Sequence, residues 1–343
     1  MSIKRVGVWQ TAFLGDAVLT LPLLQSLAGS FPDSEIYFFV RKGLKSLFDP
    51  NPRYKVVEFD KHRLDSGLKG IVRMASRIRN LEFDLWISPH TSLRSAAISF
   101  LGRAKIRMGY NHPLHNHIAF TQTVSRRFNE LDEIERILEL VKPLKPGIME
   151  TWPFLALSRE ARDNADNFWN EKIRGKTLGI HPGSTWPTKK WPEKYFAEII
   201  SMAGELSETQ VIIFAGPGEE NTVKEIMSRI SQKEHVINLA GNLSLPELAA
   251  FLSKLDCYLT NDSGPMHLAW PQKVPTIAMF GPTSRKLGFF PRGSSSTVLE
   301  TNLSCRPCGL HGHKICPEKH HKCMLDIYPE TVMASIKEKL NVP

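Results

Sequence analysis

The sequence lacks any uninterrupted apolar run approaching the ~20 residues that a helix needs to span a bilayer. Its N-terminal stretch, MSIKRVGVWQTAF, starts basic, but Gln10 and Thr11 break the apolar part, and no signal-peptide core or cleavage site follows. We therefore expect this stretch to form a first strand and the protein to stay in the cytoplasm. Internal repeats and low-complexity tracts are also absent. A composition of 42% hydrophobic and 23% charged residues is that of an ordinary globular chain.

Acidic residues are fewer than basic ones, and the formal net charge is +9. The excess is uneven, because residues 1–150 hold 22 Lys and Arg against 15 Asp and Glu. A basic N-terminal half suits an anionic partner, such as a phosphorylated substrate, a membrane surface or nucleic acid. The alternative is a merely solvated basic surface. Because the basic residues are dispersed and no nucleic-acid motif occurs, we expect no nucleic-acid partner.

Cysteine is scarce, with five residues in the whole chain. Cys257 lies in an apolar run and is expected to be a buried thiol. The other four follow the spacing C-x2-C-x7-C-x6-C, interleaved with histidines, at Cys305, Cys308, Cys316 and Cys323. On spacing alone this tail is a candidate structural zinc site. Reduced thiols in a structural loop are the alternative.

Apolar strands alternate with amphipathic helices through both halves of the chain, which favours two doubly wound α/β domains. In the first half we expect strands at residues 6–9, 35–40, 56–59, 83–87 and 106–109, and helices at residues 17–28, 68–80, 94–101 and 130–142. Residues 143–153 read as a linker. In the second half we expect strands at residues 177–180, 211–215, 236–239, 255–259 and 276–280.

The stretch from Thr260 to Thr283 reads as strand, tight turn, helix and second strand. Asp262 or Ser263 is expected to be the helix N-cap, and the backbone N–H groups of such a turn suit phosphate. His267, one turn further in, can add a donor. The ends of both strands would open onto one edge of a sheet, where open α/β sheets bind their ligands.

Two other loops follow expected strands and hold unusual residues. The first, TAFLGD, places Asp16 at a helix N-terminus, where the carboxylate is either functional or only an N-cap. The second, PGSTWPTKKWP, has hydroxyls, a glycine and two lysines between tryptophans, which suits phosphate; an exposed loop pinned by tryptophans is the alternative. A further turn, Gly216-Pro217-Gly218, lacks the third glycine of a dinucleotide fingerprint, which argues against a dehydrogenase.

Three motifs in order carry a family resemblance. The stretches QTAFLGDAVLTLPLL, HPGSTWPTKKWPEKYFAEII and TNDSGPMHLAWPQKVPTIAMFGPT together resemble the bacterial ADP-heptose:lipopolysaccharide heptosyltransferases, glycosyltransferase family 9. The resemblance implies an α/β fold of GT-B architecture, with two Rossmann-like doubly wound domains facing a cleft. It implies an acceptor-binding domain at residues 1–152, an ADP-sugar-binding domain at residues 153–327, and a C-terminal helix at residues 328–343 that crosses back to the first domain.

The resemblance also implies roles for individual residues. Asp16 matches the proposed general base of the L-G-D motif, and Lys189 matches the lysine that offsets the charge of the leaving diphosphate. The residues expected to bind the donor are Ser184, Thr185, Glu219, Leu243, Asp262, Ser263, Gly264 and His267. No metal is needed for the reaction and no cofactor is required, because the ADP-sugar is a substrate.

The implied reaction moves heptose from ADP-L-glycero-D-manno-heptose to the lipid A–core acceptor, with inversion of the anomeric centre. The motif TNDSGPMH followed by FGPTS resembles members that add the second heptose more than those that add the first. His90, Arg94 and Arg107 are candidate acceptor-binding residues at strand ends. We expect a monomer, peripheral at the inner face of the inner membrane, where its basic half would meet the phosphorylated acceptor.

Two alternatives remain open at this point. One is a family 9 transferase that uses another nucleotide sugar or another glycan acceptor. The other belongs to a different class, a zinc-stabilised nucleic-acid-binding protein, suggested by the charge and the Cys/His tail. Binding of ADP would favour the transferases, whereas a salt-dependent shift of labelled RNA or DNA would favour the nucleic-acid reading.

Overall fold

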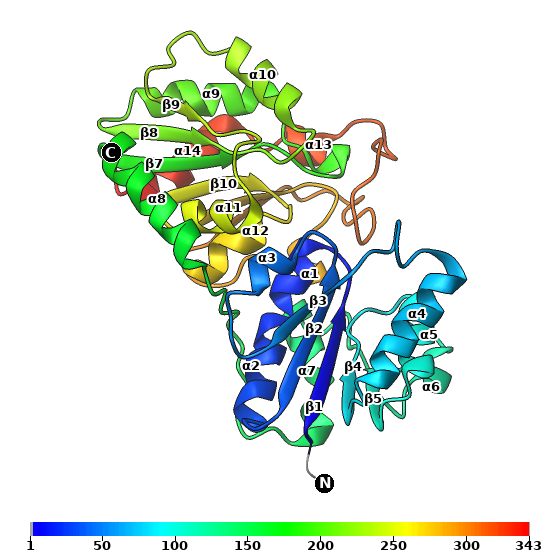
Figure 1. Cartoon of the computed structure of the whole chain (residues 1–343). Helices are drawn as coiled ribbons and strands as arrows, with labels where there is room; N and C mark the ends of the chain where they lie inside the picture. The colour runs from blue at the N-terminus through cyan, green and yellow to red at the C-terminus, as the bar shows by residue number, and fades with distance from the viewer. Residues whose placement is uncertain (1–2, 343) are drawn as a thin grey trace. The chain divides into compact units, whose positions relative to one another are not determined.

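A computed structural model describes residues 3–342, in which the chain forms two compact units. The first unit extends to Ala156 and the second begins at Leu157, four residues beyond the boundary expected from the sequence. Each unit contains one sheet of six parallel strands with helices around it (Figure 1). Within the described residues, no helix combines the length and apolar character that crossing a bilayer requires.

The first unit alternates strands and helices as expected, with one additional strand. Its strands are β1 (Arg5–Gln10), β2 (Glu35–Arg41), β3 (Lys55–Phe59), β4 (Leu85–Ile87), β5 (Ile106–Tyr110) and β6 (Gln122–Val124). Its α-helices are α1 (Leu14–Leu19), α2 (Leu21–Ser30), α3 (Lys45–Phe48), α4 (Gly67–Asn80), α5 (Leu93–Gly102), α6 (Asn116–Ala119) and α7 (Glu133–Glu139). The single helix expected at residues 17–28 is divided at Thr20, because Pro22 belongs in a first helical turn and starts a new helix there.

Aromatic side chains form the core between the first sheet and helices α4 and α5. The rings of Trp9 and Phe59 lie 4.9 Å apart and those of Trp9 and Trp86 5.9 Å apart, all fully or almost fully buried. A buried indole needs an acceptor for its N–H. Two serines one turn apart on α5 supply these acceptors, since Trp9 donates to Ser95 and Trp86 to Ser99, each at 2.9 Å.

The second unit repeats the alternation. Its strands are β7 (Lys176–His181), β8 (Thr209–Ile213), β9 (Val236–Asn238), β10 (Cys257–Asn261), β11 (Thr276–Phe280) and β12 (Thr297–Glu300). Its α-helices are α8 (Arg159–Lys172), α9 (Glu193–Gly204), α10 (Glu220–Ser228), α11 (Leu245–Leu252), α12 (Met266–Ala269), α13 (Lys322–Leu325) and α14 (Pro329–Leu340). Strands β6 and β12, at the sheet edges, were not expected from the sequence.

The C-terminal helix α14 belongs to the second unit. It packs on α9, β10 and β11, and its apolar face joins the core of that sheet through Val332, Met333, Ile336 and Leu340. These contacts all lie within the second unit, and the expectation that this helix crosses back to the first domain stays a prediction. Its apolar stripe has a partner within its own unit, and burial there provides the stabilisation that the stripe requires.

Both sheets have the same strand order. The first runs β3-β2-β1-β4-β5-β6 and the second β12-β11-β10-β7-β8-β9, all parallel, which is the Rossmann order in each case. The order reverses between β1 and β4 in the first sheet and between β7 and β10 in the second. Ligands of open α/β sheets bind where the loops at such a reversal leave the carboxyl ends of the strands.

Gly7 in β1 allows Trp86 to pack against the first sheet, because a Cβ at position 7 would lie 2.3 Å from Cε3 of that indole. We predict that Gly7→Ala destabilises the first unit by about 1–3 kcal/mol through overpacking. Gly29→Ala is the matched control, since a Cβ on this helical glycine meets no heavy atom within 4 Å. The free energy of unfolding of this control should rise by about 0.5–1 kcal/mol. Denaturant unfolding followed by tryptophan fluorescence measures both; equal effects would contradict the packing argument.

Candidate functional site

In the second unit, an ion pair joins the loops that follow β7 and β10. Lys189 Nζ lies 2.5 Å from Asp262 Oδ2, and both side chains are almost completely buried. Thr283, after β11, donates its hydroxyl to the same oxygen at 2.6 Å. The expected residues Lys189 and Asp262 are thus brought together at the reversal of strand order. Thr283 was not singled out from the sequence, although it ends the third motif.

The backbone around this pair is held by one buried asparagine. The Asn261 amide donates to Pro182 O at 2.8 Å and accepts from Trp191 N–H at 3.0 Å, so it ties both ends of the lysine loop to the end of β10. Ser184 is buried in this loop, whereas Thr185 is exposed. Both hydroxyls lie in the segment that connects β7 to Lys189, as the motif predicted.

The turn after β10 differs from the sequence expectation at the helix start. Helix α12 begins at Met266 with Pro265 as its N-cap, and neither Asp262 nor Ser263 caps it. The Asp262 carboxylate instead accepts from Lys189 and Thr283. The predicted capping role is therefore wrong, because a lysine and a hydroxyl from neighbouring strand ends offer this carboxylate stronger partners than helix N–H groups.

His267 is buried beside the ion pair and is neutral at ordinary pH. Burial, together with the Lys189 charge, lowers its pKa to about 4, against an opposing effect of Asp262. Its Nδ1 accepts from the Trp270 indole N–H at 3.3 Å. In a neutral imidazole the other nitrogen then carries the proton, so His267 has an Nε2–H donor.

Glu219 lies against the loop that follows β7. Its Oε2 accepts from Gly216 N–H at 2.8 Å and lies 3.4 Å from His181 Nε2. A Cβ at Gly183 would come within 2.0 Å of the Glu219 carboxyl carbon, so only glycine permits this approach. The structure thus brings Glu219 to the same sheet edge as the lysine loop. Leu243 is half-buried in the loop after β9, at that edge too.

The Cys/His tail packs on the lysine loop. Three hydrogen bonds join Thr188 and His313. The Thr188 hydroxyl and N–H both donate to His313 O, at 2.9 and 3.3 Å, and the His313 N–H donates to Thr188 Oγ1 at 2.7 Å. His321 Nε2 lies 2.8 Å from Thr188 O, and the rings of His311 and Trp186 are stacked at 6.2 Å. His313 and His321 thus hold Thr188, the residue next to Lys189, in position.

The four tail cysteines are free thiols, and burial raises the pKa of Cys323 to about 11. Across residues 3–342, no three Cys, His, Asp or Glu side chains form a group that could hold a metal ion. Cys305, Cys308 and Cys316 nevertheless lie close enough to Cys323 for their charges to raise its pKa, so the zinc site that the spacing suggested stays a prediction. Three of the histidines in that spacing contact the lysine loop, as described above.

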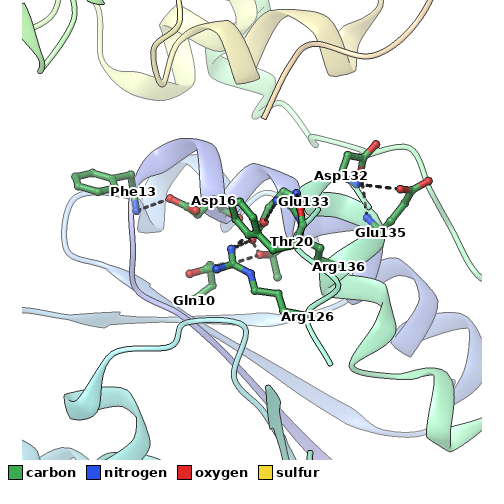
Figure 2. Close-up of polar contacts among 10 residues, drawn as sticks. Gln10, Phe13, Asp16, Thr20, Arg126, Asp132, Glu133, Glu135 and Arg136 are labelled. Atoms are coloured by element: carbon green, nitrogen blue, oxygen red, sulfur yellow. Dashed lines mark hydrogen bonds and ion pairs between the residues drawn. The ribbon is translucent and has the colours of Figure 1, made fainter. Parts of the chain in front are cut away.

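In the first unit, Asp16 lies in the first turn of α1, directly after β1 (Figure 2). Its carboxylate accepts the Phe13 N–H at 3.1 Å. Burial and, second, the charge of Glu133 raise its pKa to about 6, opposed by Phe13 N–H and Arg126. A carboxyl with this pKa is ionised at neutral pH yet basic enough to accept a proton.

A buried charge network lies beside Asp16, and sequence reasoning missed it. Arg126 Nη2 donates to both oxygens of Glu133 at 2.9 Å, and Arg136 Nη1 donates to Glu133 at 3.0 Å (Figure 2). Glu133 and Arg136 are buried, and the Arg136 guanidinium lies 4.2 Å from the centre of the Phe128 ring. The sequence signal was the RRFNELDEIER stretch, read only as the start of an acidic helix.

The three candidate acceptor residues have different surroundings. His90 follows β4, its Nδ1 lies 3.2 Å from both Thr11 Oγ1 and Ser95 Oγ, and burial lowers its pKa to about 4. Arg94, at the start of α5, donates to Lys61 O at 3.4 Å. Both lie at the reversal of strand order with Asp16.

Arg107 does not. It is the second residue of β5, near the amino end of the strand, and its guanidinium donates to the carbonyls of Ala104 and Ala119. The prediction that Arg107 binds the acceptor is therefore wrong on position, because this end of the strand lies opposite the edge that carries Asp16 and His90.

Fold and sites together define a class. Two Rossmann-like units, each with polar side chains gathered where its strand order reverses, form the GT-B architecture of nucleotide-sugar glycosyltransferases. The family description "Glycosyltransferase family 9 (heptosyltransferase)" matches residues 71–320, well over half of the chain. The chain belongs to this family and is a glycosyltransferase, a class that displaces the nucleic-acid-binding alternative.

Similar proteins cover the whole chain. Lipooligosaccharide heptosyltransferase 2 of Campylobacter jejuni subsp. jejuni serotype O:6 is 26% identical over 342 residues, which is 99% of this chain and 100% of that protein. The solved family 9 glycosyltransferase of Veillonella parvula DSM 2008 is 25% identical with a TM-score of 0.89, covering 99% and 98% of the two chains. The ADP-heptose lps heptosyltransferase II of E. coli, at 19% identity, has the same fold, with a TM-score of 0.78 and 99% of each chain covered.

The raised pKa of Asp16 predicts a dependence of stability on pH. The ordinary pKa of this carboxyl is 3.8, and its pKa in the folded protein is about 6. Ionisation of Asp16 therefore lowers the free energy of unfolding, and this loss is absent below pH 4 and complete above pH 6. We predict that Asp16→Asn stabilises the protein at pH 7 by about 1–3 kcal/mol and leaves it unchanged at pH 3.5. Denaturant unfolding at both pH values measures this; a gain of the same size at each would refute it.

Proposed function

We propose that this glycosyltransferase is an inverting enzyme that moves heptose from ADP-L-glycero-D-manno-heptose to the inner core of lipopolysaccharide. The observation that carries the proposal is Asp16, a carboxyl with a pKa of about 6 at the carboxyl edge of the first sheet. The names of the relatives support the sugar and the acceptor class, since they are lipooligosaccharide and lipopolysaccharide heptosyltransferases. One solved relative is described with ADP-heptose in its name.

Asp16 acts as the general base in this proposal. An acceptor hydroxyl attacks the anomeric carbon from the face opposite the diphosphate, and Asp16 takes the hydroxyl proton as the new bond forms. ADP leaves as the bond from the anomeric carbon to the phosphate oxygen breaks. One displacement inverts the anomeric centre. Hydrogen bonding to Phe13 N–H keeps the Asp16 carboxylate in place while one oxygen is available for the proton.

The second unit binds the donor in this proposal. Lys189 is a buried cation that offsets the charge developing on the departing diphosphate, a task that a metal performs in other transferases. Ser184, Thr185 and the N–H groups of the turn at Ser263 and Gly264 add neutral donors. His267 adds its Nε2–H without adding charge. Glu219 and Leu243 hold the ribose and adenine of the nucleotide.

The acceptor is the lipid A–core glycolipid, and we propose addition of the second heptose by a monomer at the cytoplasmic face of the inner membrane. His90 and Arg94 lie at the same edge as Asp16, which supports a role for them in contacting the acceptor. Two Campylobacter jejuni relatives are named heptosyltransferase 2, which supports this step. A family 9 transferase with another sugar or acceptor is the competing proposal.

Mass spectrometry of truncated lipid A–core acceptors incubated with the protein and ADP-heptose tests the proposal. We expect a gain of one heptose on an acceptor that already carries one, and none on an acceptor without heptose. Transfer only to the heptose-free acceptor would correct the step. Transfer from a different nucleotide sugar alone would favour the competing proposal.

The role of Asp16 predicts a separation of chemistry from binding. We predict that Asp16→Ala lowers transfer by about 10²–10⁴-fold, the usual contribution of a general base, while affinity for ADP changes only a few-fold. In the wild type, kcat/KM should rise with pH and level off above pH 6. Asp33→Ala, an exposed carboxylate before β2, is the control and should retain full activity. A small loss in Asp16→Ala would make this residue only a cap.

The role of Lys189 predicts a combined effect on binding and turnover. Lys189→Ala removes the cation and leaves Asp262 buried without its ion-pair partner, facing an anionic donor. We predict weaker donor binding and a loss of about 10²-fold or more in kcat. Lys190→Ala, the adjacent half-buried lysine, is the matched control and should change neither. Unchanged donor affinity and turnover in Lys189→Ala would remove this residue from the site.

A further inference from the structure

Exposed apolar side chains gather on one part of the first unit. Among the large hydrophobic residues that the structure describes as exposed, seven of thirteen fall between Leu64 and Ile118. Leu68 and Val72, one turn apart on α4, are 81% and 61% exposed, and Leu93 at the start of α5 is 68% exposed. Side chains of this kind that cluster on a surface mark an interaction site, whereas single ones carry no meaning.

The three helices that carry these residues are neighbours. Helix α4 packs on α5 and α5 packs on α6, and Figure 1 draws them side by side in the cyan part of the first unit. Leu114 and Ile118, 75% and 72% exposed, extend the cluster to the loop before α6 and to α6 itself. We name the exposed side chains of Leu68, Val72, Leu93, Leu114 and Ile118 the apolar rim.

Three residues of the apolar rim lie toward the carboxyl edge of the first sheet. Helices α4 and α5 start where the chain leaves the carboxyl ends of β3 and β4, so Leu68 and Leu93 are near the ends that face this edge. Leu114 likewise follows the end of β5. His90 and Arg94 lie at the same edge, and Leu93 is adjacent to Arg94 in the chain. The rim thus borders the candidate acceptor residues.

The surroundings of the rim are strongly basic. Residues 61–119 hold ten Lys and Arg against three Asp and Glu, and α4 has four basic residues and no acidic one. Lys69 and Arg77 on α4 are exposed, and no carboxylate pairs with either of them within the described residues. Lys61 lies close enough to Arg41 and Arg94 that their charges, after burial, lower its pKa. A surface with this excess of cations attracts an anionic partner.

We propose that the apolar rim and the basic face of α4 dock the enzyme on an anionic membrane surface, with the rim side chains among the lipid acyl chains and the cations at the headgroups. Protruding Leu, Ile and Val beside unpaired Lys and Arg match the two parts of such a surface. A nucleic acid would leave the rim without a partner. A protein partner of matching shape would be indifferent to the lipid headgroup.

Docking adds a membrane surface to the proposed function. It rests on that function, because the lipid-linked acceptor is part of it. A membrane-bound acceptor diffuses in two dimensions, so an enzyme held at the surface by its acceptor edge meets it at raised effective concentration. The contacts involve only the first unit. The docking surface contains none of the residues assigned to proton transfer or donor binding, so the two can be separated by substitution.

The test is co-sedimentation of the full chain with vesicles that contain no acceptor. We expect binding to vesicles of phosphatidylglycerol mixed with phosphatidylcholine, weakened by high salt, and little binding to pure phosphatidylcholine. Leu68→Ser/Val72→Ser should weaken binding about tenfold or more. Lys69→Gln/Arg77→Gln should weaken it about fivefold for each charge removed. Ile315→Ser, an equally exposed apolar residue of the second unit, is the matched control and should bind as the wild type.

Transfer to a soluble, deacylated acceptor separates this proposal from the proposed function. Variants that lose vesicle binding but retain transfer to the soluble acceptor support docking. Failure of the wild type to sediment with anionic vesicles, or undiminished binding in both double variants, overturns it, whatever the transfer assay gives. Equal binding to pure phosphatidylcholine overturns the anionic surface as the partner. Docking without any heptose transfer would refute the function and leave the docking surface standing.

Discussion

The arrangement of both units depends on the reversal of strand order in a parallel sheet. Crossover connections are right-handed, so helices that leave the sheet in opposite directions from adjacent strands cover opposite faces. The loops at that point separate and leave backbone N–H groups and side chains open to a ligand. In this chain the reversal falls between β1 and β4 and between β7 and β10. Asp16 and His90 occupy the first position, and Lys189 and Asp262 occupy the second.

Much of this could be predicted from the sequence, because strand ends are visible as apolar runs that stop at Gly, Pro, Ser or Asp. The Lys189 loop, the Asp262 turn and Asp16 all follow such ends, and the shared sheet edge brings Lys189 and Asp262 together as expected. Arg107 was placed wrongly for the same reason. It was assigned to a strand end, but a residue at the amino end of a parallel strand faces away from the ligand edge.

Contacts between distant segments could not be predicted. Arg126 and Glu133 matter because they pack beside Asp16, more than 100 positions earlier in the chain, and no local pattern encodes that proximity. The apolar stripe of α14 predicted burial but did not indicate which sheet would bury it. The tail shows the same limit, since its spacing suggests a zinc site but does not indicate that His313 and His321 bond to Thr188 in a loop that only the fold brings near.

Two carboxylates, each at the reversal of strand order in its own sheet, have different surroundings, and this difference decides what each can do. One Asp262 oxygen accepts from both an ammonium and a hydroxyl, so that oxygen is occupied and the group positions Lys189. Asp16 has a cation nearby, but the Arg126 guanidinium is bonded to Glu133 instead of to Asp16. Glu133 therefore takes the direct contact with Arg126 that would otherwise keep Asp16 ionised. After burial, the negative charge of Glu133 is the second cause that raises the pKa of Asp16. Different environments give two carboxylates different roles. Burial, with the charge of Glu133 second, thus raises the pKa of Asp16 to about 6, a value suited to accepting a proton near neutral pH.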